Sequence, residues 1–263
     1  MDKTNDSNSG DSIDIAVFMT PLSIILASII IASSIFFGLK GTDLSTSSGS
    51  NTKAADTAQP TAGDTAAAPT TTAVVSIDDD PYLGNKDKAK VAVVEFSDYE
   101  CPFCKRFHDD TFDQIVTDYV DTGKAILVYR DYPLSFHDPM ATNEAIAGEC
   151  IQDQAGNEKY FQYGDLMYTN TTSNGTGLKE QQLYDFAKQV GADEAKFKDC
   201  YTSRKFEEEV KADEDAGAKA GISGTPGFVV GTLDSDGNVD GVIVSGAQPY
   251  SAFQTALENA LAK

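Results

Sequence analysis

The stretch Glu95–Cys104, EFSDYECPFC, joins a short apolar run to two cysteines that are three positions apart. The run itself, Val91–Phe96 (VAVVEF), is rich in β-branched residues, which is typical of a strand buried on both faces. A Cys-x-x-Cys pair behind such a strand can bind a metal, close a small structural disulfide or exchange electrons with other thiols. The sequence on either side of the pair helps to distinguish these uses.

That surrounding sequence predicts an α/β domain. Apolar residues recur at near-helical spacing in residues 105–120, and Ala125–Tyr129 (AILVY) is a second β-rich run. Strand, helix and strand in this order predict a right-handed βαβ unit. Two further strands, Gly227–Val230 and Val239–Val244, flank a hairpin turn, and a closing helix is expected over Tyr250–Leu261.

The residues between these two halves have a different pattern. From about residue 139 to 219, apolar residues three or four apart mark four or five helical segments, and glycines separate them. We therefore predict a helical insertion between a βαβ half and a ββα half.

The composition excludes some classes of partner. The chain has 263 residues, 41% of them hydrophobic, and a formal net charge of −21. It can bury a sizeable core, but nucleic acid and anionic membrane surfaces would repel so acidic a chain.

The first 76 residues do not resemble a globular domain. After an acidic tail, residues 1–14, comes an uncharged apolar stretch, residues 15–38, long enough to cross a hydrocarbon core of ~30 Å as a helix. We expect a membrane anchor. A cleaved signal peptide is the alternative, but it would have a basic leading segment and a small-residue cleavage site. Residues 39–76 are dominated by Ser, Thr, Ala, Gly and Asp, which predicts a disordered linker before a globular domain at 77–263.

The position of the two cysteines suggests different roles for them. If Cys101 lies in the first turn of a helix, its sulfur faces unpaired N–H groups and the positive end of the helix dipole. Both stabilise a thiolate, which is the nucleophile in disulfide exchange. Pro102 suits that turn because its missing N–H costs nothing there. We therefore predict Cys101 as the attacking thiol and Cys104, one turn further inside, as the resolving thiol.

Two stretches together resemble a known family. YLGNKDKAKVAVVEFSDYECPFCKRF, residues 82–107, and GISGTPGF, residues 221–228, look like the DsbA-like thiol–disulfide oxidoreductases of the thioredoxin superfamily. More narrowly they are similar to its membrane-anchored, BdbD-type branch in prokaryotes. The resemblance covers nearly all of residues 77–263, and it implies a thioredoxin fold with a helical insertion, preceded by one transmembrane helix.

The resemblance also implies roles for individual residues. Glu95 matches the family's buried acid, which assists proton transfer from the resolving thiol; a carboxyl group in an apolar strand has a raised pKa, which suits that role. Thr225-Pro226 matches the cis-proline loop, which with Pro102 and Phe103 is expected to contact an incoming substrate chain. A salt-bridged structural acid is the alternative interpretation of Glu95.

The other two cysteines, Cys150 and Cys200, lie in helical segments at places where many members of this branch have a structural disulfide. We expect that pairing here. It implies an oxidising compartment, and so an anchor with its N-terminus in the cytoplasm and the catalytic domain outside a prokaryotic cell membrane.

One position departs from the family's strongest oxidants. They have Pro-His between the cysteines, and the His stabilises the thiolate, whereas this chain has Pro102-Phe103. We therefore expect a milder oxidant, nearer to glutaredoxins with Pro-Tyr, whose potentials lie at about −200 to −230 mV.

The resulting hypothesis is a monomeric dithiol oxidase that has no cofactor besides a redox-active Cys101–Cys104 disulfide. Its clients would be unfolded or reduced secreted and membrane proteins, and a membrane quinone-linked thiol oxidase, DsbB-like or VKOR-like, would recycle it. A reductase or isomerase is one alternative, and a tethered chaperone or adaptor is another.

Other interpretations of single motifs stay open at this point. Cys101, Cys104 and His108 have the spacing of three zinc ligands, although His108 is expected on a solvated helix face. The pair could also be a structural disulfide. Asp234–Asn238 hints at a calcium loop but fits a hairpin turn better, because no bidentate Glu follows. His137 is expected in a loop.

Overall fold

The computed structural model describes residues 71–263. The expected N-terminal tail, the membrane anchor and most of the expected linker lie outside these residues. Within residues 71–263 none of the helices combines the length and the apolar character that crossing a bilayer requires.

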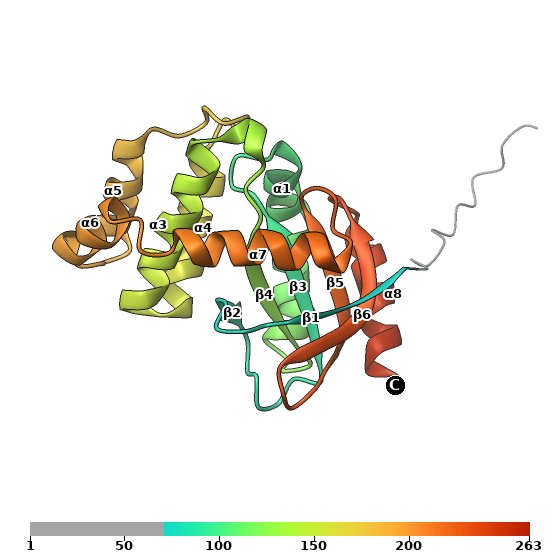
Figure 1. The fold of residues 1–263 in the computed structure, drawn as a ribbon. Helices are drawn as coiled ribbons and strands as arrows, with labels where there is room; N and C mark the ends of the chain where they lie inside the picture. Colours follow the sequence, from blue (N-terminus) through green and yellow to red (C-terminus); the bar gives the residue numbers. More distant parts are fainter. Residues whose placement is uncertain (1–70) are drawn as a thin grey trace, which may run out of the picture. The chain divides into compact units, whose positions relative to one another are not determined.

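A six-stranded mixed sheet with the order β1-β6-β5-β3-β4-β2 forms the centre of the domain (Figure 1). β3 pairs parallel with β4 and antiparallel with β5, as expected for a βαβ half joined to a ββα half. The strands are β1 (Thr72–Ser76), β2 (Tyr82–Leu83), β3 (Val91–Ser97), β4 (Ala125–Asp131), β5 (Gly227–Leu233) and β6 (Asn238–Ser245).

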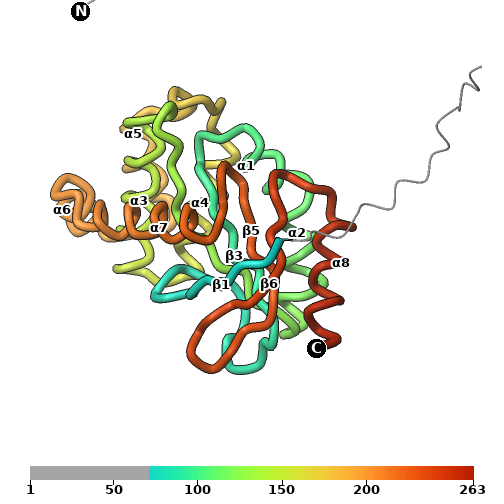
Figure 2. Tube along the Cα trace, turned by 45° about the vertical axis from the view of Figure 1, so that its right-hand side comes forward, coloured from blue at the N-terminus to red at the C-terminus, as the bar shows by residue number. Residues whose placement is uncertain are grey.

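Helices cover both faces of the sheet, which explains why β3 is apolar nearly throughout. All seven residues of β3 are buried. Because side chains alternate along a strand, Val91, Val93 and Glu95 face the helical segment after the cysteines, and Val94 and Phe96 face α7. Figure 2 shows α7 and α8 on opposite sides of the sheet.

The helical segment after the cysteines, residues 102–120, alternates between α-helical and π-helical turns; the π-helical turns are His108–Phe112 and Val116–Val120. A 3₁₀ turn, Ser135–His137, precedes the insertion. The α-helices are α1 (Pro102–Phe107), α2 (Asp113–Ile115), α3 (Met140–Ala155), α4 (Asn157–Asn170), α5 (Glu180–Gln189), α6 (Glu194–Thr202), α7 (Glu207–Ala220) and α8 (Tyr250–Leu261). α3 to α7 form the predicted helical insertion.

The predicted linker boundary is wrong by several residues. We expected a disordered linker up to residue 76, but Thr72–Ser76 is strand β1 and pairs antiparallel with β6. Val75 is buried on the sheet while Val74 is 64% exposed. A strand of this composition forms because β6 offers it a row of unpaired backbone groups, and the sequence of the segment alone carries little sign of this.

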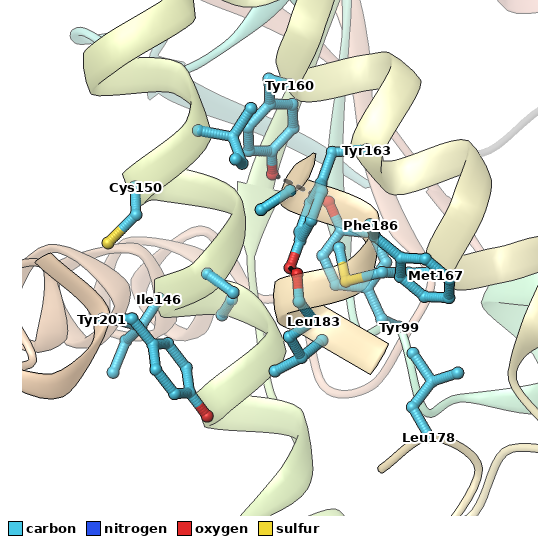
Figure 3. Close-up of a cluster of buried hydrophobic side chains, with 14 of the residues drawn as sticks. Tyr99, Ile146, Cys150, Tyr160, Tyr163, Met167, Leu178, Leu183, Phe186 and Tyr201 are labelled. Carbon is cyan, nitrogen blue, oxygen red and sulfur yellow. Dashed lines mark hydrogen bonds between the residues drawn. The ribbon is translucent and has the colours of Figure 1, made fainter. Parts of the chain in front are cut away.

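The insertion has a core of its own, which is built largely from aromatic side chains. Figure 3 shows Tyr99, which follows β3, lying among side chains of α3 and α4, with its hydroxyl donating to Tyr160 Oη at 3.1 Å. Cys150 of α3 and Cys200 of α6 are joined as a disulfide. The bridge therefore connects two helices of the insertion.

Removal of this bridge is expected to destabilise the domain. In the chain-entropy account, closing a 50-residue loop constrains the unfolded chain and contributes about 4 kcal/mol. We expect the Cys150→Ala/Cys200→Ala double variant to lose up to that much free energy of unfolding in urea. Cys101 and Cys104 should be Ser in both proteins, so that only one bridge differs. An unchanged free energy, or a free thiol at either position in non-reducing peptide maps, would contradict the assignment.

Candidate active site

Cys101 lies where the chain leaves the sheet and enters α1. It occupies the N-cap position of the helix with an extended backbone, and Pro102 follows as the first helical residue. The Cys101 N–H donates to Asp98 O at 3.0 Å, and Lys105 N–H donates to Cys101 O at 3.0 Å. Both thiols of the pair are free, so the geometry is that of the reduced dithiol.

The surroundings of Cys101 stabilise a thiolate. Its pKa is lowered to about 6, mainly by a hydrogen bond from the Cys104 thiol and further by the Thr225 side chain and the N–H groups of Cys104 and Phe103; partial burial opposes these effects. The Thr225 hydroxyl is buried and has no hydrogen-bond partner within residues 71–263. It is therefore free to donate to the Cys101 sulfur.

The surroundings of Cys104 favour the protonated thiol instead. It is fully buried, and desolvation raises its pKa well above the ordinary value, with hydrogen bonding to Cys101 adding to the effect. At neutral pH the pair therefore consists of a Cys101 thiolate and a Cys104 thiol. Such a pair can attack a disulfide through Cys101, and Cys104 becomes an effective nucleophile only after it loses its proton.

Glu95 lies on the face of β3 that Cys104 packs against. It is 2% exposed, and burial raises its pKa to about 7, against a smaller lowering by the Ser97 hydroxyl and by His108. The Ser97 side chain also lowers the pKa of Cys104, and its hydroxyl oxygen lies 2.9 Å from Tyr168 Oη. Ser97 thus lowers the pKa of both the acid and the resolving thiol, a connection that we did not predict from the sequence. A carboxyl group with this pKa can both give and take a proton near neutral pH.

The Thr225–Pro226 peptide bond is cis, and its loop lies against the nucleophile. Cys101 Sγ is 3.5 Å from Thr225 O. The Pro226 carbonyl accepts from Gly246 N–H at 2.8 Å, which fixes the loop to the segment after β6. Phe103, two residues after Cys101, is 54% exposed, one of the few large apolar side chains on the surface of residues 71–263. The residues predicted around Cys101 are therefore brought together.

The arrangement of His108 does not resemble a zinc site. Its Nε2 lies 2.9 Å from Asp165 Oδ1, and its ring packs on Phe112 and Tyr168. The prediction of a solvated face was wrong for this residue, because π-helical turns begin at His108 and side chains of α4 cover its ring.

Potential metal ligands do gather at one place among residues 71–263, but no cysteine is among them. The group consists of Asp80, Glu209 and Asp213. Arg130 pairs with Asp80 and Asp213 and so supplies these carboxylates with a positive charge. Asp234, in the motif that hinted at calcium, instead accepts hydrogen bonds from Asp236 N–H and Asn238 N–H in the β5–β6 hairpin turn.

A buried polar network lies behind the Cys-x-x-Cys motif, and sequence reasoning missed it. Asp98 Oδ2 accepts from Leu134 N–H at 3.0 Å and lies 2.7 Å from His137 Nδ1, while Asp98 Oδ1 accepts from Glu100 N–H at 2.7 Å. His137 is 3% exposed. His137 lies in the 3₁₀ turn between β4 and α3, within the connection where a loop was expected, and the network buries it there.

Glu100, next to Cys101, ties the motif to the insertion. Its carboxylate accepts from the Thr171 hydroxyl and from Gly177 N–H, both at 2.8 Å. Glu144 of α3 is fully buried, and neither of its oxygens has a donor. Burial, followed by the charge of Glu100 and a hydrogen bond to it, raises the pKa of Glu144 well above its usual range. The raised pKa keeps Glu144 as a neutral carboxylic acid beside the Glu100 carboxylate.

Because Glu144 keeps its proton in the folded protein, we predict that its contribution to the free energy of unfolding decreases as the pH rises. In the unfolded chain Glu144 ionises near pH 4.3, whereas in the folded chain it keeps its proton. Its contribution to stability is complete below that pH and is lost as the pH rises, with a slope of up to about 1.4 kcal/mol per pH unit. We expect Glu144→Gln, which mimics the neutral acid, to unfold at higher denaturant concentration than the unmodified protein at pH 8.

Urea titrations between pH 5 and pH 8 measure this effect, with the exposed Glu208→Gln as the matched control. Glu208→Gln should keep the slope of the unmodified protein. If Glu144→Gln also keeps the pH slope of the unmodified protein, Glu144 is ionised in the folded protein and its assignment as a neutral acid is wrong.

Comparison with known proteins agrees with this geometry. The family model described as Thioredoxin matches residues 76–259. Disulfide bond formation protein D of Bacillus subtilis is 30% identical over 156 residues, which are 59% of this chain and 69% of that protein.

Solved structures show the same fold. Oxidised BdbD from Bacillus subtilis superposes with a TM-score of 0.63 at 24% identity, covering 73% of this chain and 98% of that one. Alpha-DsbA1 from Wolbachia pipientis superposes with a TM-score of 0.59 at 21% identity, covering 70% and 92%. The chain therefore belongs to the thioredoxin family and is a DsbA-like thiol–disulfide oxidoreductase.

Proposed function

We propose that the protein is an extracytoplasmic dithiol oxidase that introduces disulfides into secreted or membrane proteins. The observation that carries the proposal is the unequal ionisation of the pair, with a stabilised Cys101 thiolate above a buried Cys104 thiol. Stabilising the thiolate stabilises the reduced pair, and a stable reduced form makes the disulfide a better oxidant.

The reaction proceeds in two exchanges. A client thiolate attacks Cys101 Sγ of the oxidised pair, the 101–104 bond breaks, and Cys104 leaves as a thiolate that takes a proton from Glu95. The second client thiolate then attacks the client sulfur of the mixed disulfide, and Cys101 leaves as the stabilised thiolate. The client loses two electrons and the pair gains them.

Clients are expected to be extended, reduced chains. Phe103 and the Thr225-Pro226 loop offer an exposed aromatic ring and backbone groups beside Cys101, and an extended chain can use both. A quinone-linked thiol oxidase of the membrane, DsbB-like or VKOR-like, would accept the two electrons and restore the disulfide.

The proposed location rests on two features. Residues 15–38 form an uncharged apolar stretch long enough to anchor the chain, and the Cys150–Cys200 disulfide favours an oxidising compartment for the domain. We propose a single-pass protein of a prokaryotic cell membrane with its N-terminus in the cytoplasm.

A reductase is the second candidate, and the Cys101 thiol is the reason to keep it. Its pKa of about 6 is closer to the value near 7 of thioredoxin, a reductase, than to the value near 3.5 of DsbA. The two functions differ in the reduction potential of the pair and in its redox state in the cell.

We expect a reduction potential of about −200 to −230 mV for the 101–104 pair, more oxidising than the −270 mV of thioredoxin. Equilibration with glutathione buffers measures it, and acid trapping with a thiol-alkylating reagent reports the state in cells, which should be mainly oxidised. A potential near −270 mV with a mainly reduced pair would contradict the oxidase. Cys101→Ser should abolish the oxidation of a reduced client, whereas a chaperone would keep its binding activity.

A further inference from the structure

Each cycle of the pair requires one proton to reach Cys104 and one to leave it. Cys104 is fully buried and Glu95 is 2% exposed, so neither group exchanges protons with water directly. Glu95 is the inner end of a proton path, because its charge acts directly on the Cys104 thiol and the Ser97 hydroxyl lowers the pKa of both groups. The proposed function does not explain how Glu95 takes up a proton from solvent or releases one to it.

A small cavity adjoins Glu95. Its volume is about 10 Å³, enough for about one water molecule. Glu95, Tyr168 and His108 are among its lining residues, together with Asp165. A water molecule in a protein interior needs two to four polar partners; Glu95 and His108 are the polar residues of the lining that the path would join, and aromatic rings form most of the rest.

His108 connects this cavity with the surface. Its side chain is 19% exposed, and its Nε2 lies 2.9 Å from the carboxylate of Asp165, which is 56% exposed. The imidazole ring lies between the rings of Phe112 and Tyr168, with centroid separations of 5.0 and 4.8 Å. Both ring nitrogens of an imidazole can carry a proton, so the ring can accept a proton at one side and release it at the other.

The helix geometry places the ring there. The α-helical turns of α1 end at Phe107, and π-helical turns begin at His108. Such π-helical turns are rare in proteins, and those that occur are often found at functional sites. They widen the helix where it passes the cavity, and the side chain of His108 points toward α4 and not into solvent.

We propose that His108, positioned by Asp165, is the proton relay between Glu95 and solvent, through a water molecule in the cavity. The inference rests on the proposed proton-transfer role of Glu95. When the disulfide is reduced, Glu95 gives its proton to the Cys104 thiolate, and His108 returns one to Glu95 from solvent. When a mixed disulfide on Cys101 is resolved, Cys104 gives its proton to Glu95, its thiolate displaces the partner sulfur, and the proton leaves through His108.

The experiment measures one step in isolation, the resolution by Cys104 of a mixed disulfide on Cys101. The full chain is prepared with glutathione linked to Cys101 in a mixed disulfide, and the release of glutathione by Cys104 is followed after a rapid change to neutral pH. We expect His108→Gly to slow the release by about a hundredfold, the lower end of the effects of general acid–base groups. Added imidazole should restore much of the rate, because it can occupy the space of the missing ring.

Several controls separate a proton relay from a packing role. His108→Gln fills most of the space of the ring and should be slow as well. The chain's other histidine offers a matched variant, His137→Gly, which imidazole should not rescue. The exposed Asp110→Asn on the same π-helical turn should release glutathione at the normal rate. The equilibrium of the pair with glutathione should change less than about twofold in His108→Gln, because a relay alters rates and not the two end states.

The Glu95→Gln variant distinguishes an error in the proposed role of Glu95 from an error in the proposed relay through His108. If it does not slow the release, the proposed role of Glu95 is wrong. If it slows the release but His108→Gly and His108→Gln do not, or if imidazole fails to accelerate His108→Gly, only the relay is wrong. In the Glu95→Gln/His108→Gly double variant, imidazole should have no effect.

Discussion

The hydrogen bond from the Cys104 thiol to the Cys101 sulfur is the interaction on which the chemistry of this domain depends. It is the largest contribution to the lowered pKa of Cys101, and it adds to the raised pKa of Cys104. This contact and the burial of Cys104 together separate the two thiols into a nucleophile and a proton carrier. The contact requires β3 to end just before α1 begins, so that Cys101 caps the helix and Cys104 follows one turn later beneath it.

The rest of the fold holds this junction in place. Asp98 binds backbone N–H groups and the His137 side chain around the motif, and Glu100 binds the loop after α4 and lies beside the neutral Glu144 of α3. The helical insertion thus does more than cover the sheet, since it fixes the residue before the nucleophile. Three buried carboxyl groups so close together are compatible with folding because Glu144 is neutral and the other two accept several hydrogen bonds.

Much of this could be predicted from the sequence, and what could not has a physical reason. Buried strands such as Val91–Phe96 are contiguous and apolar, so local patterns reveal them, and the βαβ order follows from chirality. The network of Asp98, Glu144 and His137 depends on contacts between residues distant in the sequence, where each polar residue alone looks like a surface residue. The placement of His108 depends on π-helical turns that have no sequence signal here. The roles of Glu95 and Phe103 remain predictions.

The central claim, that the pair divides into a thiolate and a thiol at neutral pH, can be tested by following thiolate absorbance near 240 nm as the reduced protein is titrated. The account predicts one thiolate appearing with an apparent pKa of about 6, lost in Cys101→Ser, and a second only well above the usual range for cysteine. Two thiolates ionising together near pH 8.5, the value of an unperturbed cysteine, would contradict it.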